Sequence, residues 1–244
     1  MGGASVHTCT PGLLRNGIHL RTGRVRCRNM GSTIADPFQA AIDLANTYMG
    51  NSRMILRREQ AIRLIAEQKT RCLSPEERES WIRDCWMINI SREEYSSLSD
   101  ELRKEIDDEI EPTDFSSERY TPLIIVSIIL EYCGAKNEYI STELSSLLGE
   151  QVIVEGLVEN MYPCPCCGYL SLPEELDDRA YDICPVCFWE YDGIEEDERY
   201  SSPNHMTLGE GKSNYQLFGV CDQQMVRCKD QYSEAKYFHR DDKR

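Results

Sequence analysis

The stretch "YPCPCCGYL", residues 162–170, and the stretch "YDICPVCFWEYDG", residues 181–193, each contain two cysteines separated by two residues. The first pair is Cys164 and Cys167, and the second pair is Cys184 and Cys187. A tight turn between paired cysteines aims two thiolates at one point, and two such pairs complete the tetrahedral shell of a Zn²⁺ ion. The spacing therefore predicts a structural zinc site with these four ligands.

Proline and glycine support this prediction. A proline follows the first cysteine of each pair, and Gly168 follows Cys167. Proline presets φ for the turn, and glycine can take the positive φ that folds the backbone back toward the metal. Phe188 stands in the position that corresponds to Gly168, so the sequence specifies the second turn less strongly than the first.

The third cysteine of the first motif is Cys166. Aligning "CPCCG" with "CPVCF" places Cys166 on Val186, which has no ligand atom. We therefore expect Cys166 to be an apolar spacer; the alternative is a reactive thiol activated by the nearby metal. His205 is a possible auxiliary ligand that could replace one cysteine, although a lone histidine beside a helix start is more often a hydrogen-bonding residue.

Catalytic interpretations of the cysteines are less favoured. A redox CxxC motif usually lies near a strand–helix unit, and the sequence shows none before or after these motifs. A catalytic zinc needs an open coordination position, whereas four thiolates close the shell. We expect a protein that is not an enzyme.

Composition limits the partners. The chain has 244 residues, 41% hydrophobic and 28% charged, with a net charge of -15, as in soluble globular proteins. Its longest apolar run, "LIIVSIIL", is too short for a membrane span, and no secretory signal is visible, so we expect no membrane association and a cytoplasmic location. The negative charge disfavours generic nucleic-acid binding and favours a basic protein partner.

The region around the cysteines is itself acidic. Between residues 161 and 200 there are eleven acids and two arginines, a net charge of -9. Calcium binding by "YDGIEEDE" is one interpretation, but the alternating ligands of an EF-hand loop are missing. We favour a solvated acidic loop.

The first 53 residues differ from the rest. They hold six arginines, no lysine and two aspartates, a net charge of +4, which leaves -19 for the remainder. They are either a basic tail that binds something or an upstream read-through in the gene model with Met54 as the natural start. We favour the second interpretation and expect a poorly structured extension over 1–53.

From Met54 to about residue 150 the pattern is helical. We expect an amphipathic helix beginning at Met54, a capped helix at "SPEE" (74–77), one or two charged helices over 91–110, and two helices flanking Gly134. The last two have the outline of a helix-turn-helix, but the would-be recognition helix has no Lys or Arg, so ordinary packing is favoured.

After this region we expect a short strand or a hairpin around Val152, Val154 and Leu157 and, beyond the cysteines, a helix from the N-cap Thr207 to the stop at Gly219. That helix should direct Leu208, Tyr215 and Leu217 or Phe218 toward the metal-bound segment. The polar stretch "QYSEAKYFHRDDKR" at 231–244 should fray.

At "YPCPCCGY", "YDICPVCFWEYDG", "SPNHMTLGEG" and "NYQLFG", the sequence resembles the bacterial cysteine-rich CPCC family over roughly 160–222. The stretch from Met54 resembles the longer members of that family. The resemblance implies a small zinc-ribbon-like domain and transfers no catalytic residues.

The sequence thus predicts an α+β protein, with a helical domain at 54–150 and a zinc-ribbon-like domain with a packing helix at 151–244. The favoured function is a zinc-stabilised, protein-binding module, such as an immunity or antitoxin factor. The alternatives are a nucleic-acid-associated transcriptional regulator and a thiol oxidoreductase. Neither the partner nor the oligomeric state follows from the sequence.

Overall fold

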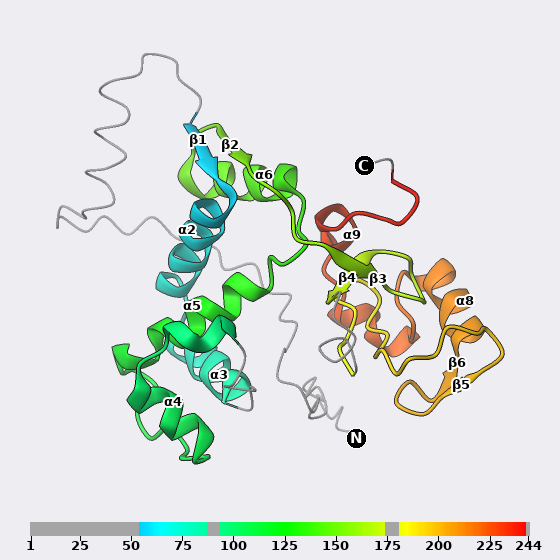
Figure 1. Cartoon of the computed structure of the whole chain (residues 1–244), viewed down its shortest axis with the longest axis horizontal. Coiled ribbons are helices and arrows are strands. Elements are labelled where there is room, and N and C mark those ends of the chain that lie inside the picture. Colours follow the sequence, from blue (N-terminus) through cyan, green and yellow to red (C-terminus); the bar gives the residue numbers. More distant parts are fainter. Residues whose placement is uncertain (1–53, 87–92, 174–180, 243–244) are drawn as a thin grey trace, which may run out of the picture.

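The fold is α+β, as predicted, and consists of a helical half followed by a half built from short strands and cysteines (Figure 1). A computed structural model describes residues 54–86, 93–173 and 181–242; the expected extension 1–53 lies outside them. The elements, with η for 3-10 helices, are β1 (Met54–Arg57), α2 (Arg58–Arg71), α3 (Pro75–Cys85), η1 (Glu93–Ser97), α4 (Asp100–Asp107), η2 (Glu118–Tyr120), α5 (Thr121–Leu130), α6 (Asn137–Leu148), β2 (Val152–Glu155), β3 (Met161–Pro163), β4 (Leu170–Pro173), β5 (Tyr200–Ser201), β6 (Met206–Thr207), α8 (Leu208–Phe218), η3 (Gln223–Cys228) and α9 (Ser233–Lys236).

The first strand corrects one prediction. Residues 54–57 are not the first turn of a helix but strand β1, which pairs in parallel with β2 so that Met54 lies opposite Val152. The helix begins only at Arg58. The local pattern is compatible with a helix. Residues 54–57 form a strand because β2 provides backbone hydrogen-bond partners for them.

The helical half, residues 54–155, has one apolar core. Helices α2, α5 and α6 pack together, and α6 also covers β2. Ile65 from α2, Leu123 from α5 and Ile140 from α6 are fully buried in this core. The capping box at Ser74 is present as predicted, and it fixes the start of α3 against α5.

Strand β2 belongs to this core. Val152 and Val154 are buried among the helices, whereas the second apolar cluster begins at Cys164. The division into separate folding domains at residue 150 stays a prediction.

The cysteine half, residues 161–242, is held by small elements around the second cluster. Strands β3 and β4 form one antiparallel pair, and β5 and β6 form another. Helix α8 starts at a capping box on Thr207 and ends at Gly219, as predicted. It directs the buried Leu208 and the partly buried Tyr215 to the cluster, as predicted. Leu217 and Phe218 are 74% and 37% exposed, so the prediction that one of these two also faces the cluster was wrong.

The prediction that the segment after residue 230 frays was also wrong. Residues 236–242, here called the strap, lie between the two halves: Tyr237 bridges to Ala135 in the helical half, and His239 bridges to Tyr169 in the cysteine half. These contacts are made largely by the backbone, so the polar composition of the strap did not reveal them. Among the described residues, no helix is both long enough and apolar enough to cross a membrane.

Candidate metal centre

The first cysteine turn is closed by two backbone hydrogen bonds. Gly168 N–H donates to the carbonyl of Cys164 at 2.9 Å, and Cys164 N–H donates to the carbonyl of Tyr169 at 2.8 Å. These bonds wrap residues 164–168 into a loop that brings Cys164 and Cys167 to one side. We call this loop the first knuckle.

The second knuckle, residues 184–188, repeats the pattern. Phe188 N–H donates to Cys184 at 2.9 Å, and Cys184 N–H donates to Trp189 at 2.9 Å. Its sulfur Cys184 Sγ also accepts a bond from Val186 N–H at 3.4 Å. The absence of glycine has therefore not changed the turn.

The last residue of each knuckle has a left-handed backbone conformation. Gly168 has φ +81° and Phe188 has φ +67°. A side chain in this region costs roughly 1 kcal/mol, which the second knuckle tolerates. At Gly168, in contrast, an added Cβ would lie 2.5 Å from His239 Nε2 and 2.8 Å from Arg240 Nε. A side chain at 168 would therefore displace the His239 and Arg240 side chains of the strap, in addition to the backbone strain that Phe188 bears in the second knuckle.

The two knuckles bring four sulfur atoms together. The Sγ atoms of Cys164 and Cys187 are 3.6 Å apart, as are those of Cys167 and Cys184, and all four lie within 4.8 Å of one another. All four residues are buried. With Zn–S bonds of 2.3 Å, the edge of a tetrahedron is about 3.8 Å. The group therefore fits a tetrahedral metal ion with four thiolate ligands.

The pKa values of the four thiols indicate that a cation is needed to ionise all of them. Burial raises the pKa of the thiols of Cys164, Cys167 and Cys187. Burial also opposes ionisation of Cys184, but hydrogen bonds from the other thiols and from Ser171 outweigh it and hold its pKa well below the usual value. Without a cation only one thiolate is favoured, whereas a divalent ion would stabilise all four.

Cys166 lies outside this group of four. It is buried, and a Cβ built on Gly211 of α8 would lie 3.5 Å from its sulfur, so the side chain is close to the helix. Val186, its counterpart in the second knuckle, is fully buried. The spacer role stays a prediction, and this packing is what such a role requires.

His205 is not part of the group either. It is exposed in the turn between β5 and β6, with φ +55°. The structure therefore does not bring the possible auxiliary ligand to the four sulfur atoms.

Three residues near the group were not predicted. Ser171 Oγ lies 3.1 Å from Cys184 Sγ. From the strap, Arg240 Nη2 donates to the carbonyl of Cys164 at 3.1 Å, and His239 Nε2 lies 3.2 Å from the carbonyl of Cys167. Ser171 lies within β4, where the sequence has no motif, and the strap is distant in sequence, so no local signal identifies these residues.

The acidic loop after the second knuckle is partly structural. Asp192 accepts a hydrogen bond from Ser201 at 2.7 Å, Asp197 is paired with Lys212 at 2.5 Å, and Glu195 accepts from Tyr162. Within the described ranges, the four cysteines are the only group of three or more His, Cys, Asp or Glu side chains close enough together to hold a metal, and the carboxylates of this loop do not gather in that way.

Comparison with known proteins agrees with this geometry. Residues 162–235 match the family described as cysteine-rich CPCC. No curated protein and no solved structure matches the chain. The match includes both knuckles and α8 and stops just before the strap.

Proposed function

We propose that this chain, which contains a cysteine-rich CPCC domain at 162–235, is a zinc-stabilised protein that binds a basic protein partner through its acidic surface and catalyses no reaction. The finer proposal is an immunity or antitoxin role, in which the acidic surface covers the nucleic-acid-binding cleft of a toxin. The observation that carries the proposal is the concentration of acidic side chains on the helical half of a chain whose other half has a candidate metal site.

Zinc is proposed because of the ligands. Four thiolates in tetrahedral arrangement suit Zn²⁺ or an iron centre, and zinc is the common structural ion in such sites. Cys164, Cys167, Cys184 and Cys187 would complete the shell and leave no position for a substrate. The zinc would hold together a half whose elements are short and whose core is small.

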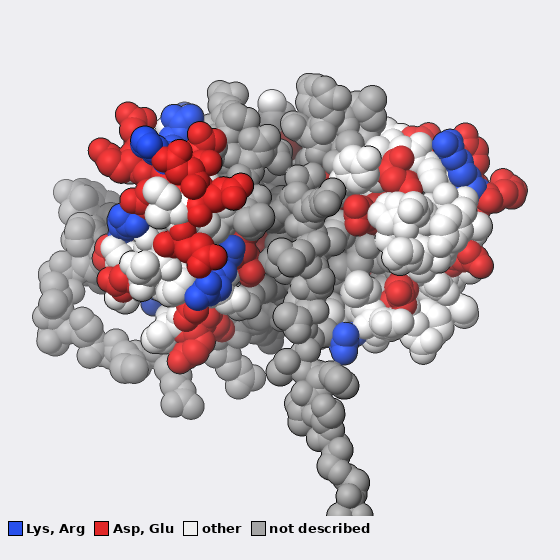
Figure 2. Space-filling model, turned by 90° about the horizontal axis from the view of Figure 1, so that it is seen from below, with Lys and Arg blue, Asp and Glu red and all other residues white. Residues whose placement is uncertain are grey.

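The acidic surface is concentrated on the helical half. Figure 2 shows Asp and Glu side chains crowded on this half, and residues 100–120, from α4 to η2, contain nine acids and three bases. Only part of this charge is paired within the chain; for example, Arg119 binds Glu105 at 2.6 Å. A surface of this sign accelerates encounter with a basic partner and repels phosphate.

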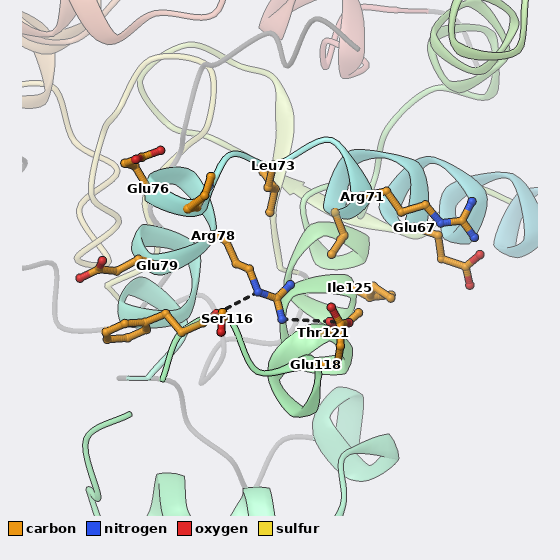
Figure 3. Close-up of a pocket in the computed structure, with 13 residues that line it drawn as sticks. Glu67, Arg71, Leu73, Glu76, Arg78, Glu79, Ser116, Glu118, Thr121 and Ile125 are labelled. Carbon is orange, nitrogen blue, oxygen red and sulfur yellow. Dashed lines mark hydrogen bonds between the residues drawn. The ribbon is translucent and has the colours of Figure 1, made fainter. Parts of the chain in front are cut away.

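A cavity of about 790 Å³ opens between α2, α3 and the segment before α5 (Figure 3). Arg71 and Arg78 are among its lining residues, but the guanidinium of Arg78 is already held by the carbonyls of Phe115 and Ser117 and by Thr121 Oγ1. Four glutamates line the same cavity, and two of them are paired on one side, Glu67 with Arg63 and Glu79 with Arg83; the other two are Glu76 and Glu118. With apolar wall residues beside these carboxylates, the opening suits the long basic side chain of a partner.

Two measurements test the proposal. Metal analysis of protein prepared without chelator should give one zinc per chain, and iron or no metal would refute the zinc assignment. Proteins retained from native cell extract should be basic and should dissociate as ionic strength rises from about 50 to 500 mM, because exposed charges are then screened. Retention of acidic proteins at all salt concentrations, micromolar affinity for an unspecific oligonucleotide, or reduction of insulin would favour another function.

A further inference from the structure

The strap contacts the first knuckle almost entirely through knuckle carbonyls. Arg240 N–H donates to the carbonyl of Gly168 at 2.9 Å, in addition to the contacts of Arg240 and His239 with the carbonyls of Cys164 and Cys167. Leu170 N–H donates in turn to the carbonyl of Phe238 at 2.8 Å. These carbonyls lie together only while the knuckle is folded, and a metal bound by Cys164 and Cys167 would hold it in that form.

The other side of the strap contacts the helical half. Lys136 N–H donates to the carbonyl of Lys236 at 2.8 Å, and Tyr237 OH donates to the carbonyl of Glu131 at 3.2 Å. The ammonium of Lys236 lies 4.3 Å from the centre of the Tyr132 ring. The strap thus binds the end of α5 and the start of α6 with one side and the knuckle with the other.

We propose that the strap is a metal-dependent latch, which binds the first knuckle only in the metal-loaded protein and then holds the helical half against the CPCC domain. This inference rests on the zinc part of the proposed function. It concerns residues 236–242, which lie beyond the part of the chain that matches the family. Loss of the metal would unfold the knuckle, release the strap and loosen the junction.

The coupling is reciprocal. If metal binding favours the docked strap, the docked strap must favour metal binding by the same factor, and such factors are typically about 5- to 150-fold. Variants that release the strap should therefore lose zinc to a competing chelator at least about fivefold more readily than the unaltered chain. They should do so without any change to a cysteine.

Gly168→Ala is the decisive variant, because its Cβ would clash with His239 and Arg240. Phe188 shows that the same turn position accepts a side chain, so the variant should still bind one zinc. The matched control is Gly193→Ala, which has a similar φ of +80° in the same half but no atom within 4 Å of the added Cβ. Backbone strain alone would affect both variants equally.

The readouts are hydrogen exchange of residues 233–242 and trypsin cleavage after Lys236, each with zinc content measured on the same sample. We expect Gly168→Ala, but not Gly193→Ala, to exchange at least tenfold faster in the strap and to be cut after Lys236. Chelator treatment of the unaltered chain should give the same strap signals.

Protection of the strap that survives removal of zinc would overturn the latch, as would normal protection in Gly168→Ala. If Gly168→Ala fails to bind zinc, the double variant His239→Ala with Arg240→Ala tests the latch instead, because it changes only side chains of the strap and none of the knuckle. Unaltered strap exchange in that variant refutes the latch. A chain that never contains zinc refutes the zinc assignment as well, so the two failures are distinguishable.

Discussion

At the scale of single residues, Cys166 and Cys164 should behave in opposite ways although both are buried cysteines in one motif. Cys166→Ala removes a small side chain outside the sulfur group and should keep one zinc per chain, with a loss of about 1 kcal/mol in the free energy of unfolding. Cys164→Ser removes a ligand and should lose the metal. Zinc content and thermal unfolding measure both, and zinc loss in Cys166→Ala would show that the ligand set is different.

Glu159 is the second residue with a specific expected effect. Its carboxylate binds the buried guanidinium of Arg58 at 2.5 Å and accepts from Gly134 N–H at 3.0 Å. Because Arg58 is buried and Glu159 is 44% exposed, Glu159→Gln should lower the free energy of unfolding by about 1–2 kcal/mol at neutral pH. Glu67→Gln, in the exposed pair with Arg63, is the control and should cost less than about 0.5 kcal/mol.

The effect of Glu159→Gln should depend on pH. Burial opposes ionisation of Glu159, but hydrogen bonds from Arg58 and from backbone N–H groups outweigh it, so the pKa of the carboxyl lies below its usual value. A carboxyl with a lowered pKa contributes stability above its unfolded pKa, near 4.3, and loses it as pH falls through the folded pKa. Denaturant titrations should show the difference from the unaltered chain shrinking below about pH 4; a constant difference would contradict this account.

At the scale of elements, the packing of α8 gives a prediction that opposes helix propensity. Alanine is favoured over glycine in helices by about 1 kcal/mol. A Cβ at Gly211, however, would lie 2.7 Å from the buried ring of Trp189. Gly211→Ala should therefore destabilise the cysteine half by about 1–3 kcal/mol.

Ser213→Ala, on the same helix, is the control for Gly211→Ala. Ser213 is exposed and its hydroxyl donates only to the carbonyl of Gly209. We expect its thermal midpoint to stay the same or to rise slightly. If Gly211→Ala raised the thermal midpoint as Ser213→Ala can, α8 would not lie as close to Trp189 as described here.

The elements also show what the sequence could and could not predict. The knuckles, the capping boxes at Ser74 and Thr207 and the end of α8 at Gly219 depend on neighbouring residues, so their motifs were sufficient. Strand β1 depends on β2, which is far away in the sequence, so its local pattern was misleading. The strap was missed for the same reason, since its partners are backbone groups of distant segments.

At the scale of the whole molecule, the two apolar cores should respond differently to removal of the metal. The four sulfurs lie in the second core, whereas the core of the helical half contains none of them. Structural zinc contributes on the order of 10 kcal/mol to the folding of small domains. A strong chelator should therefore abolish protection from hydrogen exchange in the cysteine half and leave most helical signal in circular dichroism. Cooperative loss of both halves would contradict this.

The strap also has a consequence for how the chain is made. Synthesis proceeds from the N-terminus, and segments fold as they emerge from the ribosome. Both knuckles emerge before residues 236–242, so metal can be captured while the junction is still open. A nascent chain stalled just before residue 236 should already contain zinc, yet its two halves should move independently until the strap has left the ribosome.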